Sequence, residues 1–273
     1  MLGKYKNATE YAQRRGLSGA VGKRFGIGYC PDSYGVLANH LRSLGYTSAE
    51  MKEGFLCGEG KNGKLFDYYR GRLIFPIIDP AGNVVAFGGR ALGDEKPKYL
   101  NTNDTPAFKK GRNLFALNYA KNSKEDYFIL CEGYTDVIAL HAAGFTSAVA
   151  GLGTAFTQEQ AAMLKKYKSK VVICYDGDEA GRKATNRAIP ILTAASLEVR
   201  ALSLPVGVDP DEFIQKYGKE HSADKNQGAT LQFTCLKRLF LDCKNAVSIP
   251  TALPILHRIP KTEKLFISPK GLH

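Results

Sequence analysis

Three apolar runs, each followed directly by acidic residues, constrain the fold of this chain more than any other feature. The runs cover residues 127–131, 171–175 and 199–205. The acids that follow them are Glu132, Asp136, Asp176, Asp178, Asp209 and Asp211. Short apolar runs bounded by turn signals indicate buried β-strands. Ligands of open parallel sheets bind beyond the carboxyl ends of the strands, so we expect these acids to meet there. Converging carboxylates suit a hard divalent cation, which predicts a metal centre for phosphoryl or nucleotidyl chemistry.

Strand and helix patterns alternate through this part of the chain. Strands are predicted at 127–131, 147–151, 170–175 and 198–204, and helices near 134–143, 157–168 and 178–195. Such alternation is typical of an α/β fold with a mainly parallel sheet, right-handed crossovers and flanking helices.

The preceding region has a mixed pattern, which predicts an α+β subdomain. Helices are expected at 8–15 and 34–44, and strands at 65–69, 73–78 and 84–87. Residues 91–113 are expected to form an irregular polar loop. The spacing of Gly58, Gly63 and Lys64 nearly matches a phosphate-binding loop, but Leu65 replaces the required hydroxyl residue, so a hairpin turn is expected. Gly151 and Gly153 follow a predicted strand and give a weak phosphate-loop signal.

Positive charge is concentrated in the first part of the chain. The net charge is +12. Residues 1–124 carry 20 basic and 10 acidic side chains, residues 125–218 carry 9 and 12, and residues 219–273 carry 9 and 4. A basic region beside an acidic one suits an enzyme that holds a polyanion against a metal site. On charge alone, an ordinary basic surface explains this distribution as well as nucleic-acid binding does.

An ordered set of motifs precedes the acids. They lie at 14–18, 24–28, 70–77, 87–90, 97–101 and 110–112. Together with the acidic clusters, over residues 8–218, this set resembles the catalytic core of bacterial DnaG-type DNA primases, which contains a TOPRIM domain. The resemblance implies a basic N-terminal subdomain (1–124) for template and nucleotide binding, a TOPRIM catalytic domain (125–218) and a divergent tail (219–273).

The resemblance also implies an activity, with partners and site residues. The activity is template-directed synthesis of short RNA primers on single-stranded DNA from ribonucleoside triphosphates, with Mg²⁺ or Mn²⁺. It implies catalytic roles for Glu132, Asp136, Asp176 and Asp178. It implies metal ligation by Glu132, Asp176, Asp178, Asp209 and Asp211. It implies nucleic-acid or nucleotide binding by Arg24, Arg90, Lys98, Tyr99, Lys110 and Arg112. Full-length family members contact the replicative helicase through a domain that we expect to be absent here.

Plainer explanations stay open for these residues. Glu132 and Asp136 can be an acid pair at a helix N-terminus, and Asp178 can be an N-cap. Asp209 and Asp211 can belong to a turn before a short helix at 212–216. The basic residues can be solvated surface charge. At the level of function, the alternatives are an inactive TOPRIM remnant that only binds nucleic acid, and a TOPRIM nuclease.

Several classes of protein are not expected. No apolar run approaches the roughly 18–20 residues of a membrane span, and the first residues lack the apolar segment of a secretory signal. The six cysteines form no C-x-x-C pair, so no zinc site is expected in this chain. Cys131 and Cys174 fall in predicted buried strands and are expected to be core residues in a reducing cytoplasm.

Overall fold

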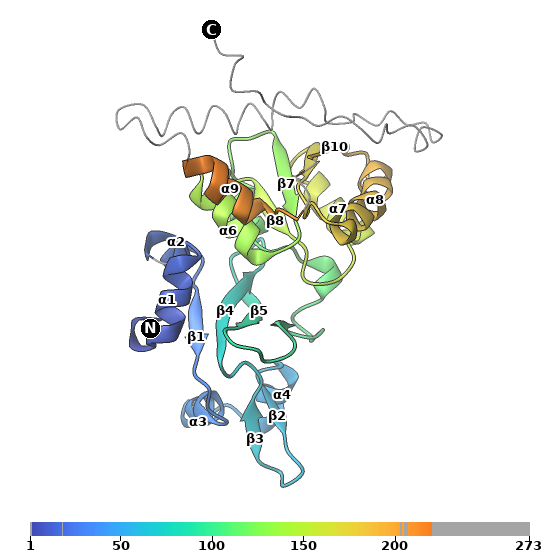
Figure 1. Ribbon diagram of the computed structural model, residues 1–273. Helices are drawn as coiled ribbons and strands as arrows, with labels where there is room; N and C mark the ends of the chain where they lie inside the picture. The colour runs from blue at the N-terminus through green and yellow to red at the C-terminus, as the bar shows by residue number, and fades with distance from the viewer. Residues whose placement is uncertain (1, 18, 203, 205–206, 220–273) are drawn as a thin grey trace.

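The computed structural model describes residues 2–17, 19–202, 204 and 207–219, so nearly all of the predicted tail lies outside the described residues. Two four-stranded sheets, each with its own helices, form the body of the molecule (Figure 1). No helix of the described segments has both the length and the apolar character needed to cross a membrane.

The C-terminal sheet is parallel, as the alternating pattern predicts. Its strand order is β10-β9-β7-β8, and every pair in it is parallel. The strands are β7 (Tyr127–Cys131), β8 (Ala148–Ala150), β9 (Lys170–Ile173) and β10 (Glu198–Ala201). The helices of this half are α6 (Tyr134–Ala142), α7 (Gln158–Lys165), α8 (Glu179–Ala194) and α9 (Pro210–Lys219).

Alternate residues of each buried strand face opposite layers of helix. Ile129 and Cys131 share a core cluster with Val137 of α6, while Phe128 and Leu130 share another with Leu164 of α7. Helices α6 and α9 therefore cover one face of the sheet, and α7 and α8 the other (Figure 1). Burial on both faces explains why these strands are continuous apolar runs in the sequence.

The N-terminal sheet is antiparallel, with the order β1-β4-β5-β6. It contains β1 (Gly28–Cys30), β4 (Arg72–Ile78), β5 (Val84–Ala91) and β6 (Tyr99–Asn101). Three short helical segments precede it: η1 (Leu2–Lys4), α1 (Lys6–Arg14) and α2 (Gly19–Arg24). The expected irregular loop at 91–113 is partly wrong, because it holds β6 and the 3₁₀ turn η2 (Lys110–Arg112); α5 (Leu117–Ala120) follows it.

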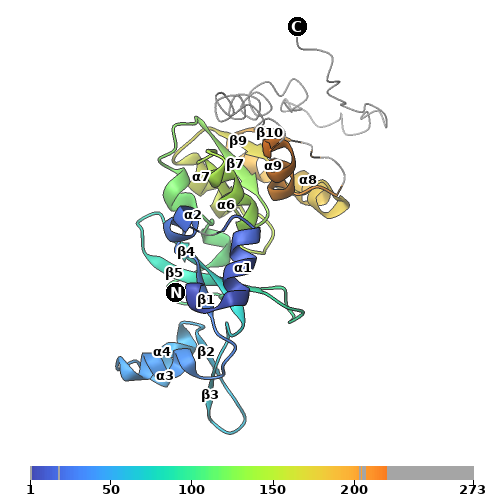
Figure 2. The same ribbon diagram turned by 60° about the vertical axis from the view of Figure 1, so that its left-hand side comes forward.

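A small lobe projects from the N-terminal sheet at the far end from the parallel sheet (Figure 2). It consists of α3 (Val36–Ser43), α4 (Ser48–Glu53), β2 (Cys57–Glu59) and β3 (Leu65–Asp67). Strands β2 and β3 pair as an antiparallel hairpin, which confirms the hairpin turn around Gly63. Buried Asp67 accepts backbone hydrogen bonds from Leu37 and Ala38, and so fixes α3 to the hairpin.

One hydrophobic core joins the two sheets. Phe75 and Ile77 of β4 belong to the same buried cluster as Phe115, Ile129 and Val137. Phe115 also exchanges backbone hydrogen bonds with Ala150 at the edge of the parallel sheet. Because the core is continuous, the basic N-terminal half has a defined position relative to the carboxyl ends of the parallel strands.

Candidate active site

A cleft of about 290 Å³ lies where the two sheets meet, beyond the carboxyl ends of β7 and β9. Its acidic side is lined by Glu132, Asp136, Asp176 and Asp209. The N-terminal half contributes Arg15, Arg90, Lys98, Tyr99 and Asn101, and Gly151 and Gly153 after β8 also belong to the lining. The expected convergence of acids from all three clusters is therefore found in the structure.

Asp136 is the most deeply buried acid of the cleft lining, with 5% of the residue exposed. It lies in the first turn of α6, where a carboxylate oxygen accepts a hydrogen bond from the backbone N–H of Gly133 at 3.1 Å. Burial, followed by repulsion from Asp176 and then Asp209, raises the pKa of Asp136 to about 8. The site therefore disfavours negative charge here unless a cation compensates it.

Glu132 directly follows β7, and Asp176 lies three residues beyond the neighbouring strand β9, so the two acids meet over the same sheet edge. The backbone N–H of Asp176 donates to Oε1 of Glu132 at 3.4 Å. Burial raises the pKa of Asp176 to about 6, with further contributions from Asp209 and Asp178. Burial also raises the pKa of Glu132, and the charge of Asp176 adds to that shift. Atom Oδ1 of Asp176 is buried and has no hydrogen-bond partner among the residues that the structure describes.

The remaining acids have local partners that the metal-ligand prediction did not include. Asp178 is exposed, accepts from the backbone N–H of Gly181 at 2.7 Å as the N-cap of α8, and is not part of the cleft lining. Asp209 lines the cleft and accepts from the backbone N–H of Glu212 at 2.6 Å.

Asp211 is 2% exposed, and its Oδ2 is paired with Nη1 of Arg15 at 3.2 Å. Of the two acids in the third cluster, Asp209 therefore faces the cleft, while Asp211 forms a salt bridge.

The basic residues divide into two groups. Arg90 and Lys98 line the cleft with Tyr99, whose hydroxyl oxygen accepts from Nη1 of Arg90 at 3.0 Å. Arg24, Lys110 and Arg112 lie outside the cleft lining. The Arg24 guanidinium stacks over the ring of Tyr119, with 5.1 Å to the ring centroid.

Lys110 and Arg112 belong to η2, which α7 holds in place. The side-chain amide of Gln160 donates to the carbonyl oxygens of Lys110 and Asn113, at 3.1 and 2.8 Å. The hydroxyl of Thr157 donates to the carbonyl oxygen of Gly111 at 2.6 Å. These contacts fix the basic turn to the outside of the parallel sheet rather than inside the cleft.

Several residues of the cleft lining were not predicted as site residues, among them Arg15, Asn101 and Tyr134. Arg15 and Asn101 fall in motifs recognised in the sequence, but no role was assigned to either. Tyr134 is packed in the core and also lines the cleft. The one feature of the sequence that could have pointed to Tyr134 as a site residue is its position two residues after Glu132.

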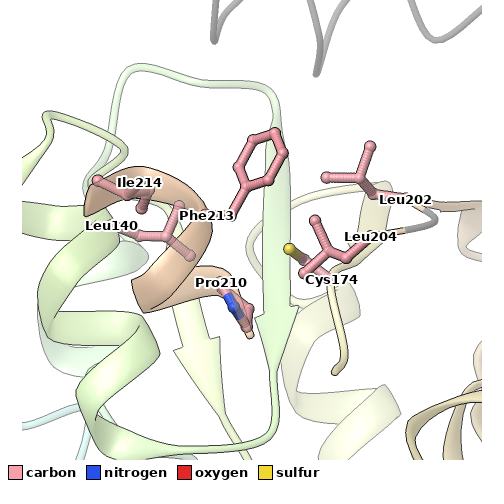
Figure 3. A pocket seen from close by; sticks show the side chains of 7 residues that line it. All are labelled: Leu140, Cys174, Leu202, Leu204, Pro210, Phe213 and Ile214. Atoms are coloured by element: carbon pink, nitrogen blue, oxygen red, sulfur yellow. The ribbon is translucent and has the colours of Figure 1, made fainter. Parts of the chain in front are cut away.

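A second cavity, of about 10 Å³, lies under α9 and is shown in Figure 3. It is lined by Leu140, Cys174, Leu202, Leu204, Pro210, Phe213 and Ile214. Its lining has no charged group, and its volume is close to that of a single water molecule. It is a packing gap that shows how α9 is seated, and α9 in turn positions Asp209.

The donors at the acidic side of the cleft fit a hard divalent cation. All are carboxylate oxygens, and within the described part of the chain buried Oδ1 of Asp176 lacks the partner that a buried polar atom normally has. Over the described ranges, no three His, Cys, Asp or Glu side chains are grouped closely enough to hold a metal ion together. The chemistry of the donors therefore matches the predicted cation, while a complete ligand set is not assembled here.

Comparison with known proteins agrees with this architecture. Residues 2–121 match the family described as DNA primase catalytic core, N-terminal domain, and residues 129–214 match the family described as Toprim-like. A DNA primase of Clostridium acetobutylicum is 48% identical over 214 residues, which are 78% of this chain and 36% of that protein. The chain thus spans about a third of the length of that relative.

Solved structures give the same answer. The Aquifex aeolicus primase, with its zinc-binding and RNA polymerase domains, matches with a TM-score of 0.78 and 40% identity over 88% of this chain and 57% of that one. A DnaG primase catalytic domain bound to single-stranded DNA matches with a TM-score of 0.70 and 34% identity over 87% of this chain and 77% of that one. This chain belongs to the family of DnaG-type DNA primases and comprises catalytic-core sequence with a TOPRIM fold.

Proposed function

We propose that the cleft synthesises short RNA primers on single-stranded DNA by metal-dependent nucleotidyl transfer from ribonucleoside triphosphates. The observation that carries the proposal is the arrangement of four acids opposite Arg90 and Lys98 across one cleft. Growing-strand and nucleotide phosphates would lie between these two sides. Membership of the family and the DNA-bound relative support the same reading.

The acidic side would hold Mg²⁺ or Mn²⁺ through Asp176 and Glu132, with Asp178 and Asp209 as further ligands. When bound, the cation would supply positive charge against the phosphates and the leaving pyrophosphate. Glu132 is the exposed acid among those that line the cleft, so we assign it the proton of the attacking 3′-hydroxyl as well. Asp136 is buried and already accepts from Gly133, so its role is to support the site.

The basic side would bind nucleic acid and nucleotide. Arg90 offers a planar donor pair to phosphate, and Lys98 offers a point charge. Tyr99 presents an aromatic ring on which a base can stack, and its hydroxyl oxygen is held by Arg90. Arg24, Lys110 and Arg112 would contact template outside the cleft, where their charge steers DNA toward it.

The proposed function also implies a cellular compartment, a protein partner and a division of the chain into two parts. We place the chain in the cytoplasm, where the four cysteines of the described residues, Cys30, Cys57, Cys131 and Cys174, stay reduced; they are free thiols in the structure. The replicative helicase is a partner implied for the full-length relatives. The boundaries 1–124 and 125–218 stay our assignment of the template-binding and catalytic parts.

Primer synthesis and its alternatives are separated by one assay. The chain is incubated with single-stranded DNA, labelled ribonucleotides and Mg²⁺ or Mn²⁺, and the products are resolved on a gel. Short RNA that depends on template supports the proposal. Shortened DNA without RNA would identify a TOPRIM nuclease, and DNA binding without either product would identify an inactive remnant.

A further inference from the structure

Tyr134 bridges the two sheets at the cleft. It is the first residue of α6, two positions after Glu132, and it is 3% exposed. Its ring lies among aromatic side chains of the N-terminal half, with centroid distances of 4.7 Å to Phe115 and 5.5 Å to Phe75. A residue of the catalytic half is therefore embedded in the core of the nucleotide-binding half.

The hydroxyl of Tyr134 starts a short chain of hydrogen bonds across the cleft. It donates to Oδ1 of Asn101 at 2.9 Å, and Nδ2 of Asn101 donates to the carbonyl oxygen of Leu152 at 2.9 Å. Asn101 belongs to β6, and Leu152 belongs to the glycine loop after β8. One side-chain amide thus ties β6 to the carboxyl edge of the parallel sheet.

The backbone is shaped to admit this arrangement. Gly88 is the partner of Asn101 across β5 and β6, and a Cβ atom at Gly88 would lie 2.4 Å from Cε2 of Tyr134. A Cβ atom at Gly153 would lie 2.8 Å from Nδ2 of Asn101, and the φ angle of Gly153 is +75°. Both glycines leave room that only this ring and this amide fill.

We infer that Tyr134 and Asn101 act as a positioning pair that holds β6 at a fixed distance from the acids. Strand β6 begins with Tyr99, and Lys98 precedes it directly, so the pair sets where these groups lie relative to Glu132 and Asp176. The inference rests on the proposed function, because it names what sets the geometry of that reaction. Misplacement of a reacting group by about 1 Å costs about a hundredfold in rate, so a small movement of β6 has a measurable effect.

The test compares two conservative variants of the full chain. Tyr134→Phe keeps the ring and removes the hydroxyl. Tyr69→Phe is the matched control, because Tyr69 is 2% exposed, its hydroxyl lies 2.6 Å from Oγ1 of Thr102, and it does not line the cleft. Each variant loses one buried hydroxyl whose partner lies in β6 or directly after it, Asn101 for Tyr134 and Thr102 for Tyr69. Asn101→Ala and the double variant with Tyr134→Phe complete a double-mutant cycle.

Two readouts are taken. In primer synthesis, we expect Tyr134→Phe to lower kcat about tenfold while KM for ribonucleotides stays within about twofold, and Tyr69→Phe to match the wild type. In hydrogen exchange, we expect faster exchange in the peptide covering 151–154 for Tyr134→Phe only, because the hydroxyl of Tyr69 bonds to Thr102 and not to this loop. The double variant should be no slower than Asn101→Ala, because both changes break one chain of hydrogen bonds.

Each contrary result has a definite meaning. A kcat for Tyr134→Phe equal to that of the wild type, or an equal loss in Tyr69→Phe, overturns the positioning role and leaves simple packing. If the wild type makes no RNA, the proposed function fails, and hydrogen exchange alone decides this inference. Equal exchange in the two tyrosine variants would then overturn it.

Discussion

Replacing Asp136 by Asn is expected to stabilise the folded protein at neutral pH in the absence of a divalent cation. Burial and the neighbouring acids raise the pKa of Asp136 to about 8 in the folded state. An unfolded chain would have a value of about 4. The folded state therefore binds this proton more tightly than the unfolded state does, and stability is lost as pH rises from about 4 to about 8.

The size of the effect follows from the same shift. Each pH unit across this window costs about 1.4 kcal/mol, so at pH 7 the limit is roughly 4 kcal/mol. Relaxation of the cleft and sharing of the repulsion among neighbouring acids reduce this to about 2 kcal/mol. Since about 2–4 °C of melting temperature corresponds to 1 kcal/mol at this size, Asp136→Asn should melt about 5 °C higher at pH 7. The amide oxygen of Asn can still accept from Gly133.

The assay is thermal melting in EDTA from pH 4.5 to 8.5. The melting curves of wild type and Asp136→Asn should converge at low pH and separate as pH rises. Asp126→Asn is a control whose effect on stability has the opposite sign. A hydrogen bond from Lys170 lowers the pKa of exposed Asp126, so its charge stabilises the fold at neutral pH. Loss of this surface pair costs less than about 1 kcal/mol. Parallel pH dependences for wild type and Asp136→Asn would refute the reasoning.

Three further outcomes are expected. Removing both Arg90 and Lys98 by alanine substitution should lower the slope of log affinity against log salt for single-stranded DNA by about 1.4, and an unchanged slope in a binding titration would place the template elsewhere. Gly181→Ala should lower the free energy of unfolding, measured with denaturant, by about 1–3 kcal/mol, because the added Cβ would lie 2.1 Å from the carbonyl oxygen of Asp176. A smaller loss would show that the start of α8 can shift to make room. Phe213→Ala should cost about 2 kcal/mol by removing packing of α9 around the apolar cavity in Figure 3, and an unchanged melting temperature would show that α9 contributes little.

The parallel sheet could be predicted from the sequence because its strands are buried on both faces. Runs such as 127–131 are then apolar throughout and stand out from the helices between them. The three-residue strands β1 and β6 could not be predicted, since each is only half-buried and exists through pairing with β4 or β5. Their formation depends on tertiary contacts that leave no periodic pattern in the sequence.

The acids of the cleft were predictable for a similar reason. A carboxylate that follows a buried parallel strand has one edge of the sheet to which it can point. The partner of Asp211 was not predictable, because Arg15 is the C-cap residue of α1 and lies 196 residues earlier in the sequence. The place of Tyr134 in the cleft was not predictable, because its contacts, Gly88 and Asn101, belong to the other sheet.

The central claim is that the carboxylates of the cleft support metal-dependent RNA synthesis on a DNA template. The most direct measurement compares the full wild-type chain with Asp176→Asn, using single-stranded DNA, labelled ribonucleotides and Mg²⁺ or Mn²⁺. Asn keeps the shape of the side chain and removes the charge, so the fold should survive, as melting would show. We expect short template-dependent RNA from the wild type and none from the variant. Near-wild-type synthesis by a folded Asp176→Asn variant would contradict the account.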